Sequence, residues 1–396
     1  MRRSGTAALL MFALGGCTSP SGADAPPRWA APRPALSATT ASGSVGVVVE
    51  RGLIDCFEAG LLAPPKGDKP GSLVHCEASA AVFDGHRIII ASDKPIPQHS
   101  PVFSLASSGS DLAHAPREFL MDEAFLEARK LEDMTLTPDG ALAFAITGFD
   151  RVQRDSSDDD SYNTLLAWRV SPQVLDVRRV HGEQHGNVRS SVGLRRRFAA
   201  ALVCAQHPGG PAYFKIEALA AIPGSRLLFG VREVGRTHKD FAFAVKILAA
   251  PYQVSASGEV TLGELRLVYD ADTTLPVLGR SLAVSSLEYD RFGDRLLLLT
   301  SFEMAESDEG IGAFLWTLTL KDFEAGRSPK PVVNEAGEPL LLAHKGEAVT
   351  VLSKGRVLIV ADDDRVTGRP ATQVTDPARH FFRLPHQASF TIVELR

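Results

Sequence analysis

The chain has 396 residues, of which 44% are hydrophobic and 22% are charged, and its formal net charge at pH 7 is −5. This hydrophobic share is sufficient for a globular core. Acidic and basic residues are interspersed, so the sequence lacks the basic face that nucleic-acid binding requires, and we expect no nucleic-acid partner.

The first 17 residues have the pattern of an export signal. Two arginines precede an apolar run at residues 7–14, and Gly15, Gly16 and Cys17 follow the run. The run is too short for a permanent membrane helix, and small residues before a cleavage point are typical of a signal peptide. Residues 14–17 also resemble the lipobox of bacterial lipoproteins, so we predict lipidation of Cys17. An ordinary secretory signal with an incidental cysteine is the alternative interpretation.

Residues 18–42 are rich in Pro, Ala and Ser, a composition that buries too little apolar surface to fold, and they predict a disordered tether. Residues 43–396 contain no apolar stretch of membrane-spanning length, and we expect them to form one domain of a monomeric protein. The predicted lipid is then the membrane anchor. Thr18 stands where many lipoproteins of the inner membrane have Asp, which favours the outer membrane of the cell envelope and leaves the leaflet open.

Three cysteines follow Cys17 in the sequence: Cys56, Cys76 and Cys204. An oxidising compartment permits one disulfide among them, and Cys56 with Cys76 is the pair that is nearest in sequence. Cys204 ends an apolar run and is expected to be a small buried residue.

One unit recurs along the chain. It consists of a Glu, an alternating apolar stretch, a turn that contains Gly, and a dense aliphatic run with a polar end. Two short apolar segments separated by turn residues are typical of a β-hairpin that is buried on both faces. The copies begin at Glu77, Glu132, Glu217, Ser285 and Glu347, and Ser285 stands where the other copies have Glu.

Repeated hairpins of this kind predict an all-β fold, a β-propeller with five blades. A sixth blade stays open in the long interval between Glu132 and Glu217. Residues 45–49 and 390–395 both have strand-like sequences and are expected to complete one blade together, which would close the ring. A β-sandwich is the main alternative, but it does not explain a Glu at the start of each unit.

In a propeller the start of each first strand and the end of each second strand share one face, so the repeat predicts a charged pocket around the axis. Ca²⁺ prefers six to eight oxygen ligands, which makes the repeated carboxylates a candidate calcium site. Its predicted ligands are Glu77, Glu132, Glu217 and Glu347. The basic residues of the same face would hold a negatively charged substrate. They are Lys94, Lys130, Arg151, Lys215, Lys345 and Arg365.

The same residues support a second interpretation. Lys130, Lys215 and Lys345 each stand two positions before a Glu, and positions two apart on a strand face the same side. Lys and Glu of neighbouring blades would then pair as a belt that holds the ring shut without a metal ion. Both interpretations stay open at this point.

Other clusters of polar residues are weaker candidates. His181 and His185 have a zinc-like spacing, but the sequence around them lacks the HExxH order, so we expect a surface loop. The acidic run at residues 155–160 is expected to be a solvated loop. The three arginines at residues 195–197 are expected to be a solvated segment end, and a phosphate-binding role stays open.

The segment from Lys130 to Gly140, with residues 347–352 and 360–364, resembles the "esterase-like activity of phytase" group of bacterial secreted proteins. The resemblance covers the blade motifs from about Glu77 to Arg365 and implies a propeller with Ca²⁺-assisted phosphoester or ester hydrolase activity. Two departures are the Ala or Asp that follows the Glu, where the group usually has Gly, and Ser285.

The sequence thus predicts a membrane-anchored, extracytoplasmic propeller with a charged axial pocket. One hypothesis is a phytase-like, Ca²⁺-assisted hydrolase of a small anionic or ester substrate. The other is a non-catalytic envelope scaffold that binds a protein partner on its propeller face and whose Lys/Glu ring is purely structural. Whether the protein is an enzyme is left open by the sequence.

Overall fold

The computed structural model describes residues 43–65, 67, 69–106, 112–150, 159–171, 176–181, 191–271, 274–275, 280–303, 311–362 and 383–396. The predicted export signal, Cys17 and the tether lie outside these residues. Within the described part, no helix has the length and apolar character needed to cross a membrane.

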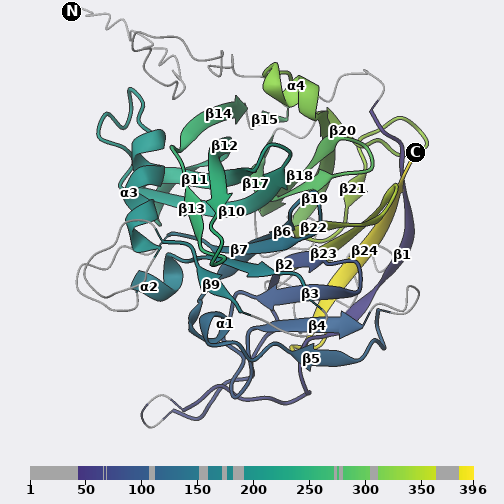
Figure 1. The fold of residues 1–396 in the computed structure, drawn as a ribbon. Coiled ribbons are helices and arrows are strands. Elements are labelled where there is room, and N and C mark those ends of the chain that lie inside the picture. Colours follow the sequence, from purple (N-terminus) through teal and green to yellow (C-terminus); the bar gives the residue numbers. More distant parts are fainter. Residues whose placement is uncertain are drawn as a thin grey trace, which may run out of the picture.

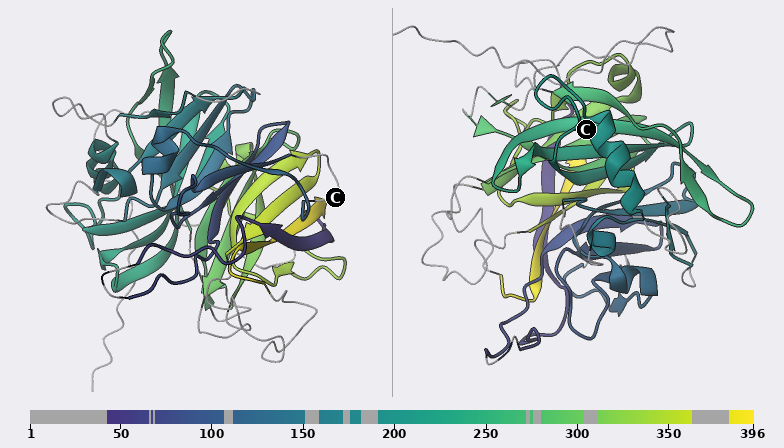
Figure 2. Two further views of the ribbon diagram at one scale, coloured as in Figure 1. Left: turned by 90° about the horizontal axis from the view of Figure 1, so that it is seen from below. Right: turned by 90° about the vertical axis from the view of Figure 1, so that its left-hand side faces the viewer.

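The fold is a five-bladed β-propeller, as the repeat predicts. Figures 1 and 2 show the antiparallel sheets fanned around a common axis. Blade 1 consists of β2 (Ala78–Phe83), β3 (Arg87–Ser92), β4 (Val102–Ala106) and β5 (Arg117–Phe119). Blade 2 consists of β6 (Leu131–Leu136), β7 (Leu142–Thr147), β8 (Leu165–Arg169) and β9 (Arg178–Arg179).

The other blades are longer and two of them carry an extra strand. Blade 3 consists of β10 (Tyr213–Ile222), β11 (Arg226–Thr237), β12 (Asp240–Val254) and β13 (Val260–Leu262), with β14 (Arg266–Ala271) also paired to β12. Blade 4 consists of β17 (Ala283–Asp290), β18 (Arg295–Glu303), β19 (Ile311–Thr319) and β20 (Lys330–Pro331), with β21 (Leu341–Leu342) also paired to β19. Blade 5 consists of β22 (Gly346–Ser353), β23 (Arg356–Ala361), β24 (Gln387–Leu395) and β1 (Gly46–Asp55). A small ribbon joins β15 (Thr274–Leu275) to β16 (Arg280–Ser281).

Blade 5 closes the ring with both ends of the domain. Strand β1 pairs antiparallel with β24 from Gly46 opposite Leu395 to Asp55 opposite Gln387. Strand β24 in turn pairs with β23. The predicted pairing of the N- and C-terminal strands is therefore confirmed, and both strands are longer than the sequence indicated.

The core lies between the blades rather than in one central cluster. The inner strands contact one another in the cyclic order β2, β6, β10, β17, β22 and back to β2. Five hydrophobic clusters fill the spaces between successive blades, one at each interface. Each blade is thus buried on both faces, which is why its second strand carries a continuous aliphatic run rather than an alternating one.

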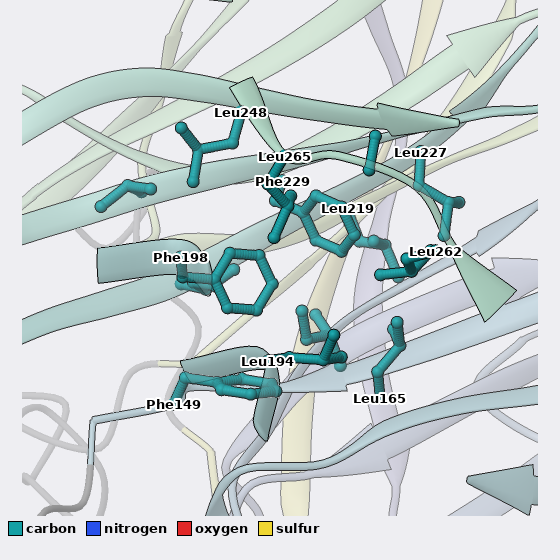
Figure 3. Packing of buried hydrophobic residues seen from close by; sticks show 14 of the residues in the cluster. Phe149, Leu165, Leu194, Phe198, Leu219, Leu227, Phe229, Leu248, Leu262 and Leu265 are labelled. Atoms are coloured by element: carbon teal, nitrogen blue, oxygen red, sulfur yellow. The ribbon is translucent and has the colours of Figure 1, made fainter. Parts of the chain in front are cut away.

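The long interval between the second and third copies of the repeat holds helices instead of a sixth blade. Helix α3 (Val192–Ala201) packs against the strands from outside, and the right-hand view of Figure 2 shows it in teal. Its Phe198 ring lies 5.0 Å from the ring of Phe149 and 5.1 Å from that of Phe229 (Figure 3). Leu194 of the same helix joins this cluster. The described residues of the interval form no sheet beyond blade 2.

Three shorter helices lie in the connections between strands. They are α1 (Glu123–Glu127), α2 (Asp159–Tyr162) and α4 (Leu320–Glu324). In α1 the carboxylate of Asp122 accepts a hydrogen bond from the N–H of Ala124, and in α4 the hydroxyl of Thr319 accepts one from the N–H of Asp322. Both are N-cap bonds that satisfy a helix-end donor.

A disulfide joins Cys56, just after β1, to Cys76, just before β2. Both cysteines are fully buried, and their Cα atoms lie 6.1 Å apart. This bond therefore links the last strand of the ring's closing blade to the first strand of blade 1.

Candidate functional site: a charged belt around the axis

Each inner strand has a β-bulge at the same level. The register against the second strand shifts around one residue in every blade. These bulged residues are Ser79, Glu132, Glu217, Ser285 and Glu347. Because a bulge re-aims the extra side chain, the five residues form one polar layer at the start of the inner strands.

This layer corrects the sequence alignment of blade 1. The equivalent of the repeated Glu is Ser79, and Glu77 stands two positions earlier. The backbone carbonyl of Glu77 accepts a hydrogen bond from Asp93, as the carbonyl of Lys130 does from Gly148. Glu77 therefore occupies the position that Lys130, Lys215 and Lys345 occupy in other blades. Compared with the other blades, blade 1 has the opposite arrangement of charges: an acid, Glu77, precedes its first strand and a base, Lys94, follows its second strand.

The charged residues around this layer form what we call the axial belt. Its members are Glu77, Asp93, Lys94, Lys130, Glu132, Asp150, Lys215, Glu217, Arg232, Glu233, Glu303, Lys345 and Glu347. They come from all five blades and the connections next to them. The repeat therefore brings together all four predicted acidic ligands and four of the predicted basic residues, whereas Arg151 and Arg365 lie outside the described residues.

Lys215 links blades 2 and 3 within the belt. Its Nζ lies 3.2 Å from Oε1 of Glu132 and also contacts Oε1 of Glu217. Lys130 lies 3.5 Å from the same Glu132 oxygen and 3.0 Å from Oδ2 of Asp150. Gly148 leaves the necessary space, because a Cβ there would lie 3.1 Å from Oε1 of Glu132.

Arg232 of blade 3 extends into blade 4, where Ser285 stands in place of the repeated Glu. Its Nη1 lies 3.0 Å from Oε2 of Glu217 and donates a hydrogen bond of 2.9 Å to Oγ of Ser301 in blade 4. The Ser285 hydroxyl donates to the carbonyl of Gly346 in blade 5, at 2.8 Å. The small side chains of blade 4 thus leave room for a guanidinium that arrives from blade 3.

The remaining belt pairs join blade 5 to blade 4 and lie within blades 5 and 1. Lys345 Nζ lies 2.7 Å from Oε1 of Glu347 and 3.5 Å from Oε2 of Glu303. Lys94 Nζ lies 2.6 Å from Oε2 of Glu77, and half of the Lys94 side chain is exposed. Every carboxylate that the sequence proposed as a Ca²⁺ ligand therefore contacts at least one ammonium or guanidinium group.

Burial and these neighbours set the ionisation of the belt. Burial raises the pKa of Glu132 to about 7, against the opposing effect of Lys215 and Lys130. Burial also acts on Glu217, but Arg232 and Lys215 outweigh it and lower the pKa of Glu217 to about 2. The surrounding carboxylates hold the pKa of Lys215 well above its usual value in spite of burial. The cations of the belt therefore stay charged at neutral pH.

These residues do not fit a calcium ion. Among the residues that the structure describes, no three Asp, Glu, His or Cys side chains converge as a metal-ligand group. Ammonium groups already neutralise the carboxylates that Ca²⁺ would need as ligands. The Ca²⁺ site and the substrate-binding role of the lysines stay predictions without support from this geometry.

Below the belt, Asp133 lies on the axis and joins three blades. Its Oδ2 accepts hydrogen bonds from the N–H groups of Leu219 (2.8 Å) and Leu287 (3.2 Å), and its Oδ1 accepts one from Met134 (2.9 Å). The Ser286 hydroxyl lies 3.1 Å from both oxygens and accepts a bond from the N–H of Val349 in blade 5. One carboxylate and one hydroxyl therefore satisfy the inner-edge donors of four blades.

A second polar layer follows two residues further along the inner strands. The hydroxyl of Thr135 accepts a bond from the N–H of Ala221, and that of Thr350 accepts one from Phe83. Thr135 also lies 3.3 Å from Oε2 of the buried Glu288, whose carboxyl accepts a further bond from the backbone of Val351. Side chains thus bridge the inner strands at two levels beneath the belt.

The sequence analysis missed Asp133 and Glu288. The available signal was the residue after each bulge, which is Ala80, Asp133, Ala218, Ser286 and Ala348 in the five blades. An alignment of the blades on this position, which holds a small residue in four of the five blades, would have matched Ser79 with the repeated Glu. It would also have shown Asp133 as the one carboxylate at that position.

A cavity of about 570 Å³ lies away from the belt, where α1, β9 and the β12–β13 connection meet. Asp122, Glu127, Arg178, His181 and Glu259 are among its lining residues. Arg178 pairs with Glu259 across it, at 3.4 Å. His185, which the sequence paired with His181, lies outside the described residues.

The arginines of α3 have backbone partners. Arg195 donates to the carbonyls of Phe149 and Ala212, and Arg197 donates to those of Leu262 and Gly263. These contacts fasten α3 to blades 2 and 3. They give Arg195 and Arg197 a structural role, and the phosphate-binding role stays an untested prediction.

Comparisons with known proteins assign the chain to no family. No family model and no curated protein match the chain, so the resemblance to the esterase-like activity of phytase group is not confirmed. Solved structures that are similar include Pseudomonas fluorescens PhoX in complex with vanadate, with 12% identity, a TM-score of 0.38, and coverage of 89% of this chain and 75% of that chain.

Two other similar structures are a luciferin-regenerating enzyme and the PQQ-bound aldose sugar dehydrogenase of Streptomyces coelicolor. The first has 7% identity, a TM-score of 0.35, and coverage of 88% of this chain and 95% of that chain. The second has 10% identity, a TM-score of 0.31, and coverage of 88% and 99%. At these values the likenesses carry no argument about activity.

The axial position of Asp133 predicts a large loss of stability on substitution. Asp133→Ala leaves three buried N–H groups without an acceptor, and we expect a decrease of about 3–5 kcal/mol in the free energy of unfolding. Denaturant titration measures this change. The exposed Glu338→Ala is the matched control and should change stability by less than about 0.5 kcal/mol. Equal effects of the two substitutions would contradict the assignment.

Glu288 predicts a pH dependence of stability. Burial raises the pKa of Glu288 to about 8, so the folded state binds this proton more tightly than the unfolded chain does. The stability linked to this proton is complete below about pH 4.5 and is lost as pH rises through 8. Glu288→Gln has no proton to lose, so it should match the wild type at pH 4 and exceed its stability by up to about 5 kcal/mol at pH 9. A pH-independent difference in thermal unfolding would refute this.

Proposed function

We propose that the protein is a lipid-anchored, extracytoplasmic scaffold that binds a protein partner on its propeller surface, and that its axial belt is structural. The observation that carries this proposal is the engagement of Glu77, Glu132, Glu217 and Glu347 by cations of the belt itself. A propeller whose polar residues hold its own blades together needs no ligand at the axis.

The energetics of the belt support this proposal over the hydrolytic hypothesis. A calcium ion at Glu217 would have to displace Lys215 and Arg232, and separating one buried ion pair costs about 3–5 kcal/mol. An anionic substrate would also find every cation of the belt already paired with a carboxylate of the belt.

Two measurements on purified, chelator-treated protein test the proposal. We expect no calorimetric heat of Ca²⁺ binding, and no hydrolysis of p-nitrophenyl phosphate or p-nitrophenyl acetate above the level of Glu217→Gln. The exposed Glu338→Gln is the control for nonspecific effects of losing a carboxylate. Ca²⁺ binding or hydrolysis that Glu217→Gln abolishes and Glu338→Gln preserves would overturn the proposal in favour of the Ca²⁺-assisted hydrolase.

A further inference from the structure

Blades 2 and 3 are joined at the level of the belt by an ion pair and a hydrogen bond, and we call this junction the belt seam. The inner strands β6 and β10 are neighbours there (Figure 1). Lys215 Nζ of blade 3 lies 3.2 Å from Oε1 of Glu132 in blade 2. One residue further along, the N–H of Ile216 donates a hydrogen bond of 2.8 Å to the carbonyl of Gly148. The N–H of Gly148 donates in turn to the carbonyl of Lys130, so both contacts of the seam lie on one stretch of backbone.

Glu132 receives little from the lysines beside it. The hydrogen bond of Lys130 goes to Asp150, at 3.0 Å, and that of Lys215 goes to Glu217. Oε1 of Glu132 is buried and accepts no hydrogen bond from the residues that the structure describes. A buried carboxylate oxygen without a hydrogen bond is costly in the charged form, and a proton on the carboxylate removes much of that cost.

The other two carboxylates at the bulges differ from Glu132 in this respect. Arg232 has Glu217 as its nearest carboxylate, at 3.0 Å, and Lys345 has Glu347, at 2.7 Å. Both lysines beside Glu132 lie closer to another carboxylate than to Glu132 itself. Glu132 can therefore take up a proton without leaving a cation of the belt unpaired.

The charged groups that face Glu132 come from three blades. They are Asp93 of blade 1, Lys130 and Asp150 of blade 2, and Lys215 and Glu217 of blade 3, and Arg232 pairs with Glu217 behind them. Burial raises the pKa of Glu132 to about 7, with Glu217 and Asp93 acting in the same direction and the two lysines opposing it. An open seam exposes this carboxylate to water, where its pKa returns toward 4.5. The stabilisation of the closed seam by the proton is therefore complete below about pH 4.5 and is lost as pH rises through 7.

The backbone of the seam is strained in the closed state. Lys130 has a φ of 56° and Phe149, next to Gly148, has a φ of 52°. This left-handed region is unfavourable for residues other than glycine, so the contacts of the seam must offset the strain. A loss of stabilisation at Glu132 thus acts on a junction that already favours local opening.

We propose that Glu132 is a proton switch that controls the belt seam. A neutral Glu132 keeps the seam closed, and its ionisation makes local separation of the inner strands of blades 2 and 3 more frequent. An exported protein, as proposed above, would meet changes of external pH to which such a junction responds. The inference concerns the belt itself and goes beyond the proposed binding of a partner, on which it does not rest.

Amide hydrogen exchange of Ile216 measures the opening of the seam, because this N–H bonds across the seam to Gly148. Exchange is followed between pH 6 and pH 8 on the full chain after chelator treatment, and it is corrected for the pH dependence of chemical exchange. We expect the protection of Ile216 to fall about tenfold over this range in the wild type. Leu228, in the centre of β11, reports unfolding of the whole domain and should not show the same change.

Two variants assign the proton. Glu132→Gln resembles the neutral carboxyl, so the protection of Ile216 should stay at its high value from pH 6 to pH 8. Glu77→Gln is the matched control, because burial raises the pKa of Glu77 to about 7 as well but Glu77 lies in blade 1, outside the seam. This control should retain the tenfold change at Ile216.

Protection of Ile216 that does not change with pH in the wild type would overturn the proposal, whether or not the variants fold. An equal change at Leu228 would also overturn it, because the proton would then act on the whole domain. A pH dependence that persists in Glu132→Gln, or that disappears in Glu77→Gln, would place the proton elsewhere and would overturn the assignment to Glu132.

Discussion

The structure depends on how five inner strand edges end at a common axis. Each inner strand has a partner on one side only, so its other edge presents backbone N–H groups toward the buried centre of the ring. Asp133 and Ser286 accept the bonds of one level, and Thr135, Thr350 and Glu288 accept those of the next. Polar residues in the most buried strands are therefore a requirement of the radial arrangement and need no ligand to explain them.

In the axial belt, too, polar side chains of the protein satisfy one another. Carboxylates at three of the five bulges would repel one another, and lysines from the same or neighbouring blades separate them. Blade 4 has Ser285 at its bulge, and Arg232 of blade 3 reaches across to Ser301 of blade 4. Ion pairs also join blade 2 to blade 3 and blade 4 to blade 5, and removal of one member leaves a buried partner uncompensated.

The fold could be predicted from the periodic features of the sequence. Recurrent turns and aliphatic runs such as Ile88–Ile90 predicted five blades, because a segment buried on both faces must be apolar throughout. The strand-like ends predicted the closure of the ring, which β1 and β24 make. Helix α3 could not be distinguished from a strand of a sixth blade, because the apolar run at residues 198–203 is too short for its periodicity to separate a helix from a strand.

The site was harder to predict than the fold. Glu77 matched the repeated Glu in sequence, but the bulge of blade 1 lies at Ser79. A shift of two residues keeps the same side chains on the same face of the strand, so the alternating pattern did not reveal the misalignment. Asp133 resembled an ordinary polar neighbour of Glu132, because its role depends on donors 86 and 154 residues away. The spacing of Lys and Glu two positions apart predicted an ion-pair belt as one of two interpretations, and the contacts of Lys130, Lys215 and Lys345 favour that interpretation.

A double-mutant cycle on Lys215 and Glu217 tests the central claim most directly. The variants Lys215→Met, Glu217→Gln and their combination are compared by denaturant unfolding in the presence of a chelator, with the exposed Arg236–Asp240 pair as the reference. If the belt is an internal chain of ion pairs, the Lys215–Glu217 coupling will stabilise the fold by about 1–3 kcal/mol, and the reference pair will contribute less than about 0.5 kcal/mol. A coupling no larger than that of the reference pair would contradict the account.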